Sequence, residues 1–166
     1  MKRLWAPWRF EYVTRSTDEG QPCVFCQALD PKTPSDYILH LGDHVFVVLN
    51  KYPYSNGHVM VVLRRHVGRM EDATPDELQE LIRMTRLAEM TLTEVYHAHG
   101  INVGINVGRP AGAGVIDHLH VHLVPRWEGD TNFMSVVADT RVVPEDLATS
   151  LNRLKPVFER LVEVDR

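Results

Sequence analysis

Three histidines alternate with apolar residues over the stretch HLHVHLVPRW, residues 118–127. They are His118, His120 and His122, and the residues between them are leucine and valine. Side chains of a β-strand alternate between its two faces, so this pattern predicts a strand with three imidazoles on one face and a core on the other. A single histidine on a polar strand face needs no special explanation. Three in register do, because other polar residues are more common than histidine on such a face.

Five segments have the composition of β-strands, and short turns join several of them, which favours a mainly antiparallel sheet. These segments are residues 37–41, 44–50, 58–63, 101–107 and 118–124. Gly42-Asp43, between the first two, suits a type II′ hairpin turn.

Two segments have the sequence of helices. Thr74 is a candidate N-cap with Glu77 three residues later, which is the capping-box pattern, and Gly100 is a natural stop. A second helical pattern starts at Pro144, and Pro156 inside it is expected to kink or split that helix. Strands and two helices in this order predict an α+β fold.

The chain has 166 residues, enough for one domain that buries its own core. We expect an irregular N-terminal arm over residues 1–36, a core over 37–134 and a helical segment over 135–166. The net charge of −4 does not suggest a nucleic-acid-binding surface, and no apolar run is long enough to span a membrane. The N-terminus lacks the apolar region of a secretory signal, so we expect a cytoplasmic protein.

The three histidines allow three kinds of chemistry. They could hold a hydrolytic metal ion, act as nucleophile and proton carrier on a phosphate, or form a pH-sensing patch. The glycine-rich loop GRPAGAG, residues 108–114, ends four residues before the first histidine. Backbone N–H groups of such loops bind anions. A phosphate held beside an imidazole is the arrangement of phosphoryl or nucleotidyl transfer, so the loop favours the second interpretation.

The two cysteines stand together as Cys23-Val24-Phe25-Cys26. This spacing fits a redox pair, half of a zinc site or two buried thiols. A thioredoxin-like motif would open a helix after a strand, whereas this segment lies in a proline-rich region that we expect to be irregular. The redox interpretation is therefore the weakest of the three.

The stretch from His118 to Val124 resembles the His-φ-His-φ-His-φ-φ signature of the histidine triad (HIT) superfamily, where φ is apolar. The resemblance extends over LNKYPYSNGHVMVVLRRH, GINVGRPAGAG and HLVPRWEGDTNFM. The N-terminal LWAPWR and the final VPRW…GDTNFM resemble the bacterial branch related to diadenosine tetraphosphate (AP-4-A) phosphorylases, which is close to the Fhit-like dinucleoside polyphosphate hydrolases. The resemblance implies a five-stranded sheet with two helices, in a homodimer whose sheets join.

The resemblance also implies roles for single residues. His120 matches the family's nucleophile, which attacks the α-phosphorus of a nucleotide and forms a nucleotidyl-histidine. His122 matches the histidine that contacts the phosphate, and His58 matches one beside it. Asn50 matches a ribose-contacting residue, and Asn106 matches a polar residue at the phosphates.

The same comparison assigns the phosphate-binding loop to Gly112, Ala113 and Gly114. Fhit-like hydrolases carry a glutamine near this point, and this chain has none. The departure favours phosphorolysis over simple hydrolysis. A divalent cation bound with the nucleotide could assist in either case. Two alternatives stay open: a purine nucleoside phosphoramidase of the Hint-like branch, and a nucleotide-binding module without catalysis, which would not need the intact triad.

Some members of the superfamily pair a Cys-x-x-Cys with two histidines to bind zinc. Carried over to this chain, the four ligands are Cys23, Cys26, His66 and His118. A closed site with four protein ligands is structural. It would remove His118 from acid–base chemistry and fix one end of the strand that carries His120.

Overall fold

The computed structural model describes residues 22–130 and 145–165, and all structural statements below concern these residues. Most of the predicted N-terminal arm and the predicted boundary at residues 134–135 lie outside them. No helix in the described ranges is long and apolar enough to cross a membrane.

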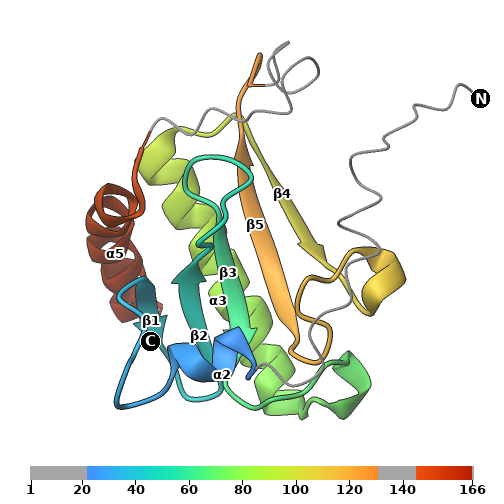
Figure 1. Ribbon diagram of the computed structural model, residues 1–166. Helices are drawn as coiled ribbons and strands as arrows, with labels where there is room; N and C mark the ends of the chain where they lie inside the picture. The colour runs from blue at the N-terminus through green and yellow to red at the C-terminus, as the bar shows by residue number, and fades with distance from the viewer. Residues whose placement is uncertain (1–21, 131–144, 166) are drawn as a thin grey trace, which may run out of the picture.

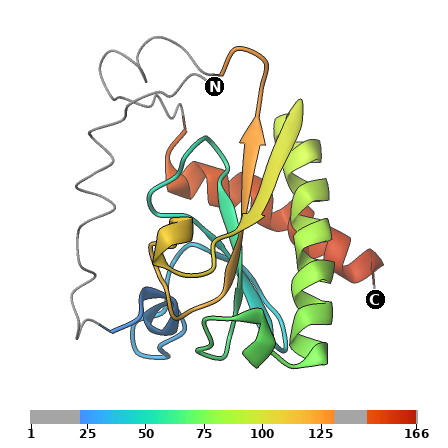
Figure 2. The same ribbon diagram turned by 90° about the vertical axis from the view of Figure 1, so that its right-hand side faces the viewer.

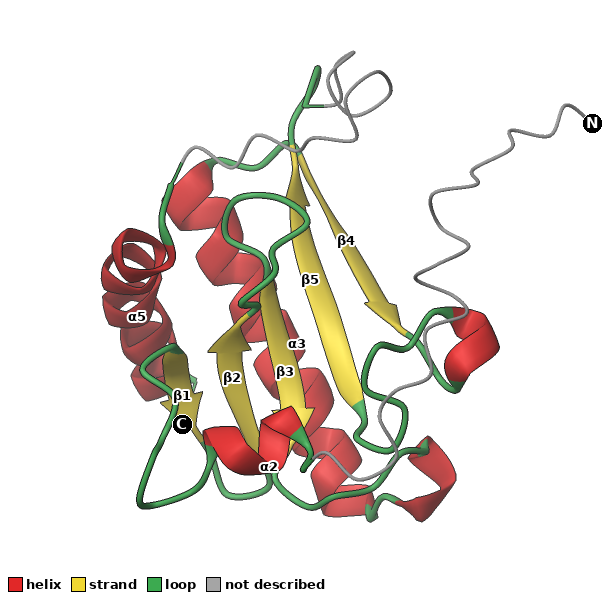
Figure 3. Ribbon diagram, in the orientation of Figure 1, coloured by secondary structure: helices red, strands yellow, loops and turns green. Residues whose placement is uncertain are grey.

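The described residues form a five-stranded antiparallel sheet in the order β1-β2-β3-β5-β4 (Figures 1 and 3). The strands are β1 (Ile38–Leu41), β2 (Val45–Leu49), β3 (Val59–Leu63), β4 (Gly100–Ile105) and β5 (His120–Arg126). The predicted α+β class and five-stranded sheet are confirmed. The histidine strand β5 lies between β3 and β4, inside the sheet, where both of its neighbours fix its register.

Helices cover the sheet unequally. Figure 2 shows α3 (Pro75–Tyr96) and α5 (Leu147–Val164) on one face, and α2 (Val24–Ala28) with the short helix η2 (Arg109–Ala111) on the other. Another short helix, η1 (Met70–Asp72), precedes α3. Thr74 and Glu77 form the predicted capping box of α3.

The alternation predicted for β5 divides the core into two layers. Under α3 and α5, the strands contribute Val45, Val47, Leu49, Val59, Val61, Leu63, Val121 and Leu123. On the other face, Phe25 of α2 packs with Phe46, Val48, Met60 and Val62. The second layer adjoins the histidines, because Val62 pairs with His120 and Met60 with His122 in the β3–β5 ladder.

Several expectations for local structure were wrong. The segment expected to be irregular contains α2, so residues 22–130 and 145–165 contain three α-helices rather than the two expected for the fold. The second long helix starts at Leu147, with Asp146 as N-cap, and Pro156 does not split it. Pro156 is exposed, so water can solvate the carbonyl that it leaves without a partner, while the buried face of the helix stays packed.

The turn between β1 and β2 is not of type II′, because Gly42 does not have the positive φ that this turn requires. The carboxylate of Glu80 in α3 accepts hydrogen bonds from the backbone N–H groups of Asp43 (3.1 Å) and His44 (2.8 Å). A side chain distant in sequence therefore holds this turn.

Candidate active site

The structure brings His58, His120 and His122 together on the face of the sheet opposite to α3 and α5. The rings of His120 and His122 lie edge to face, 4.7 Å apart, and those of His58 and His122 are 5.2 Å apart. Burial lowers the pKa of His120, and it lowers that of His122 to about 4 together with the charge of His120. Both imidazoles are therefore neutral at pH 7.

The hydrogen bond of His120 determines which of its nitrogens can react. Its Nδ1 lies 2.7 Å from the carbonyl oxygen of His118, and a carbonyl can only accept. The proton of the neutral ring is therefore on Nδ1, and Nε2 carries a lone pair. A neutral imidazole with an available Nε2 is a nucleophile of the kind that forms covalent intermediates.

A second chain of hydrogen bonds fixes His122. The backbone N–H of Tyr54 donates to Nδ1 of His58 over 3.1 Å, so the proton of His58 is on Nε2. That Nε2 donates to Nδ1 of His122 over 3.0 Å. The remaining nitrogen of His122 then carries its proton and can donate to a phosphate oxygen, as expected for charge stabilisation in phosphoryl transfer.

Asn50 belongs to the same chain of contacts. Its Nδ2 lies 3.3 Å from Nδ1 of His58, and its Oδ1 accepts from the backbone N–H of Tyr52. Sequence comparison matched Asn50 with a ribose-contacting residue. In the structure, both ends of its amide contact neighbouring protein groups, and one of those groups is His58.

The predicted phosphate loop lies at the end of β4. Gly112 has a φ of +93°, a conformation that favours glycine, and its carbonyl accepts from Asn106 over 3.4 Å. The N–H groups of Gly112 and Ala113 donate to Arg109 and Gly108 within the loop. A phosphate bound by these N–H groups would therefore compete with the loop's own hydrogen bonds. Gly114, the last residue of the predicted phosphate loop, follows this turn.

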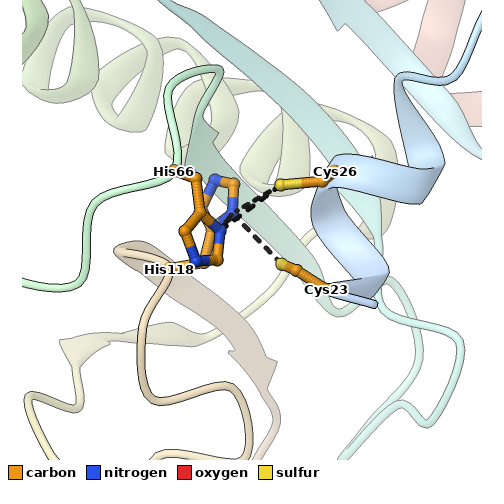
Figure 4. A group of neighbouring side chains, drawn as sticks. All are labelled: Cys23, Cys26, His66 and His118. Atoms are coloured by element: carbon orange, nitrogen blue, oxygen red, sulfur yellow. Dashed lines mark hydrogen bonds between the residues drawn. The ribbon is translucent and has the colours of Figure 1, made fainter. Parts of the chain in front are cut away.

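The first histidine of the triad is turned away from the other two. His118 is fully buried, and its Nε2 donates to the carbonyl oxygen of Leu63 over 2.7 Å. Its Nδ1 therefore carries a lone pair, and it faces Cys23, Cys26 and His66 (Figure 4). The three imidazoles do not converge on one point, which argues against a metal ion held by the triad alone.

The four side chains around His118 Nδ1 fit a tetrahedral metal site. This nitrogen lies 3.3 Å from Cys23 Sγ, 3.7 Å from Cys26 Sγ and 3.2 Å from His66 Nδ1. Tetrahedral zinc with ordinary bond lengths separates two nitrogens by about 3.3 Å and a nitrogen from a sulfur by about 3.6 Å. The bond from His118 Nε2 to a carbonyl is also usual for a metal-binding histidine. The predicted ligands thus form one group that could hold a metal ion.

Two contributors to the site were missed by sequence reasoning. One is the backbone N–H of Tyr54, for which a side-chain pattern carries no signal. The other is Phe25, whose ring lies 4.9 Å from that of His120. Its position between two cysteines was visible in the sequence, but its contact with β5 depends on the placement of α2.

Comparison with known proteins agrees with this geometry. The profile of the HIT domain family matches residues 31–129. The AP-4-A phosphorylase of Mycobacterium tuberculosis (strain H37Rv) is 39% identical over 96% of this chain and 86% of its own length. The asymmetrical bis(5'-nucleosyl)-tetraphosphatase of Schizosaccharomyces pombe is 38% identical over 49% of this chain and 44% of its own length.

Solved structures give the same result. A zinc-bound histidine triad family protein from Mycobacterium smegmatis superposes with a TM-score of 0.70 at 26% identity, covering 86% of this chain and 96% of its own. The sheet order, the triad and the family match over most of the chain lead to one conclusion. This protein belongs to the HIT family and is an enzyme of that family.

Proposed function

We propose that this enzyme cleaves a phosphoanhydride bond of a dinucleoside polyphosphate, of the diadenosine tetraphosphate class, by nucleotidyl transfer through His120. The observation that carries the proposal is the 2.7 Å bond from His120 Nδ1 to the carbonyl of His118, which leaves Nε2 as the nucleophile. The substrate class is that of the relatives named AP-4-A phosphorylase and tetraphosphatase.

The reaction proceeds in two displacements. Nε2 of His120 attacks the α-phosphorus, so a P–N bond forms as the P–O bond to the leaving nucleoside polyphosphate breaks. Inorganic phosphate then attacks the same phosphorus, and the P–N bond returns its electrons to Nε2. With diadenosine tetraphosphate the products are ATP and ADP. If water replaces phosphate as acceptor, AMP is formed instead of ADP.

The neighbouring groups support these steps. His122, neutral and with its proton directed away from His58, donates to a phosphate oxygen as charge develops. His58 holds His122 in that protonation state. Asn106 and the loop of Gly112, Ala113 and Gly114 follow β4 and would receive the remaining phosphates by exchanging hydrogen bonds that they now make within the loop. A divalent cation bound with the substrate would share the charge of these phosphates.

The experiment that tests this proposal is a product assay on diadenosine tetraphosphate with and without inorganic phosphate, for the wild type and His120→Ala. We expect ADP and ATP only with phosphate, and a loss of at least about 10³-fold in the variant. His44→Ala, an exposed histidine outside the site, is the control and should retain full activity. Activity that survives in His120→Ala would overturn the covalent mechanism, and AMP formed without phosphate would make the enzyme a hydrolase.

We also propose that Cys23, Cys26, His66 and His118 hold a structural zinc ion. The interatomic distances and the donor types support it, as does the zinc-bound histidine triad protein among the structural neighbours. A closed four-ligand zinc adds no catalytic group; it ties α2, the loop after β3 and the start of β5 to one another.

A homodimer is proposed as the working form. In the described sheet, β4 is a terminal strand, and Val103 on it is 50% exposed. An edge strand with an exposed apolar residue can pair with a second copy and continue the sheet. Light scattering should then give about twice the 19.0 kDa of one chain.

A further inference from the structure

Phe25 lies where the metal-ligand group and the nucleophile meet. It occupies the position between the two cysteines, on α2, and its side chain is 5% exposed. Its ring is 4.9 Å from His120, 5.3 Å from His118 and 6.5 Å from Phe46. By contrast, Val24, the other residue between the cysteines, is 56% exposed. The Cys-x-x-Cys segment therefore presents one large side chain to the catalytic strand.

The contact with Phe25 restrains the tilt of the His120 imidazole, which the hydrogen bond of His120 leaves free. The carbonyl of His118 fixes the position of Nδ1, but one hydrogen bond leaves the ring able to tilt about it. The rings of Phe25 and His122, 4.9 Å and 4.7 Å away, limit this tilt. The direction of the Nε2 lone pair follows from the ring plane, and in-line attack on phosphorus depends on that direction.

The segment that carries Phe25 is too short to be stable alone. The α2 helix has five residues and no side-chain cap, and isolated helices of this length do not form in water. Its described attachments are the apolar layer around Phe46 and the contacts of Cys23 and Cys26 with His66 and His118. Binding of a metal by these four side chains would fix α2, and with it the ring of Phe25.

We infer that Phe25 is a positioning residue through which the Cys23–Cys26 segment orients His120 for attack. The inference rests on the nucleotidyl transfer proposed above. It gives the metal group a role in the rate of the reaction, exerted through an apolar contact, in addition to a role in stability.

The test compares Phe25→Leu and Phe25→Ala with Phe158→Leu. Phe158 is fully buried in the other core layer, on the opposite face of the sheet, so the control loses a ring without touching His120. We expect the single-turnover rate of nucleotidyl-histidine formation to fall about threefold to tenfold in Phe25→Leu and about tenfold to a hundredfold in Phe25→Ala, with KM changed less than about threefold. Phe158→Leu should lower the melting temperature and leave this rate within about twofold.

A spectroscopic measurement accompanies the kinetics. Long-range ¹H–¹⁵N correlation spectra at pH 8 report which nitrogen of His120 carries the proton. We expect the Nδ1–H form in the wild type. In Phe25→Ala the ring can tilt out of line with the carbonyl of His118, which weakens the hydrogen bond that selects this form, so we expect a mixture of both forms. Cys26→Ser, which removes an exposed metal ligand, should give the same mixture and a similar rate, and the double variant should be no slower than the slower single one.

Three results would overturn the inference: an unchanged rate in both Phe25 variants, a rise in KM alone, which would place Phe25 against the nucleotide, or fully additive effects of Phe25→Ala and Cys26→Ser. His120→Ala separates this failure from failure of the proposed function. If that variant is inactive while the Phe25 variants are normal, nucleotidyl transfer stands and the positioning role falls. If it is active, the proposed function itself falls.

Discussion

At the scale of single residues, protonation in the site is set by backbone groups. The carbonyl of His118 places the proton of His120 on Nδ1, and the N–H of Tyr54 excludes a proton from Nδ1 of His58. An imidazole with an available Nε2 lone pair, His120, and an imidazole with an available N–H group, His122, thus arise from neighbouring positions of the same strand. The imidazole side chains are chemically identical. The nitrogen that carries the proton is therefore determined by the hydrogen bonds that the backbone groups make with each ring.

The pKa of His122 gives a prediction for the pH dependence of catalysis. Burial and the charge of His120 lower it to about 4, so His122 stays neutral well below 6.5, where an ordinary imidazole gains its proton. A proton on Nδ1 of His122 would face the N–H of His58, 3.0 Å away, and break that contact. Because the pKa of His120 is lowered as well, we expect kcat to stay level from pH 8 to about 6, and to be lost by about pH 4, where His122 gains a proton. Initial-rate measurements at saturating substrate check this, and a decline centred near 6.5 would contradict it.

At the scale of elements, the sequence was most informative where one residue type repeats with a fixed period. Alternation predicted β5 and its two faces from His120 onward, although His118 lies before the strand and not on its histidine face, and the capping box predicted the start of α3 at Pro75. The sequence was least informative where a side chain distant in sequence determines the local conformation. Gly42 suggested a hairpin turn from its local conformational preference, but Glu80 of α3 holds that turn. The α2 helix was missed because its few residues gain stability only from contacts with distant parts of the chain.

The start of α3 provides a second prediction. Glu77 is 5% exposed, accepts from Arg65 and from the N–H of Thr74, and has a pKa lowered to about 2, chiefly by Arg65. A lowered carboxyl pKa stabilises the fold above the unfolded value of about 4.5, and this stabilisation is lost as the pH falls from there toward 2. Because Arg65 is half exposed, we expect Glu77→Gln to reduce the free energy of unfolding at pH 7 by about 1–3 kcal/mol.

Urea denaturation at pH 7 and pH 3 measures this effect. The difference between wild type and Glu77→Gln should shrink at pH 3, because the unfolded chain then binds a proton at this carboxyl group while the folded chain still holds it mostly ionised. Asp76→Asn, an exposed change in the same helical turn, should alter stability by less than about 0.5 kcal/mol. A difference between wild type and Glu77→Gln that is the same at both pH values would show that the Glu77 charge does not stabilise the fold.

At the scale of the whole molecule, the candidate site depends on elements from three parts of the chain. Cys26 lies in α2 and Cys23 is the N-cap of that helix, His66 comes from the loop after β3, and His118 comes from the residues before β5. Resemblance to a family was needed to select these four from nine histidines and two cysteines, because spacing within the sequence does not show which side chains meet. The structure supplies the physical reason, since β3 and β5 are neighbours in the sheet and α2 lies against their ends (Figure 1).

Removal of the metal should therefore loosen one end of the molecule and leave the helical layer of α3 and α5 in place. We expect protein purified without chelators to contain about one zinc per chain, and its removal to lower the melting temperature by about 5–10 °C, equivalent to a few kcal/mol for a chain of this length. Cys26→Ser should melt at the temperature of the metal-free wild type and show no further change with chelator.

Hydrogen exchange of the metal-free protein should increase in α2 and at the start of β5, while α3 stays protected, because its core contacts lie on the opposite face. Well under one zinc per chain, or uniform loss of protection across the sheet and α3, would contradict a structural zinc ion that joins these three segments.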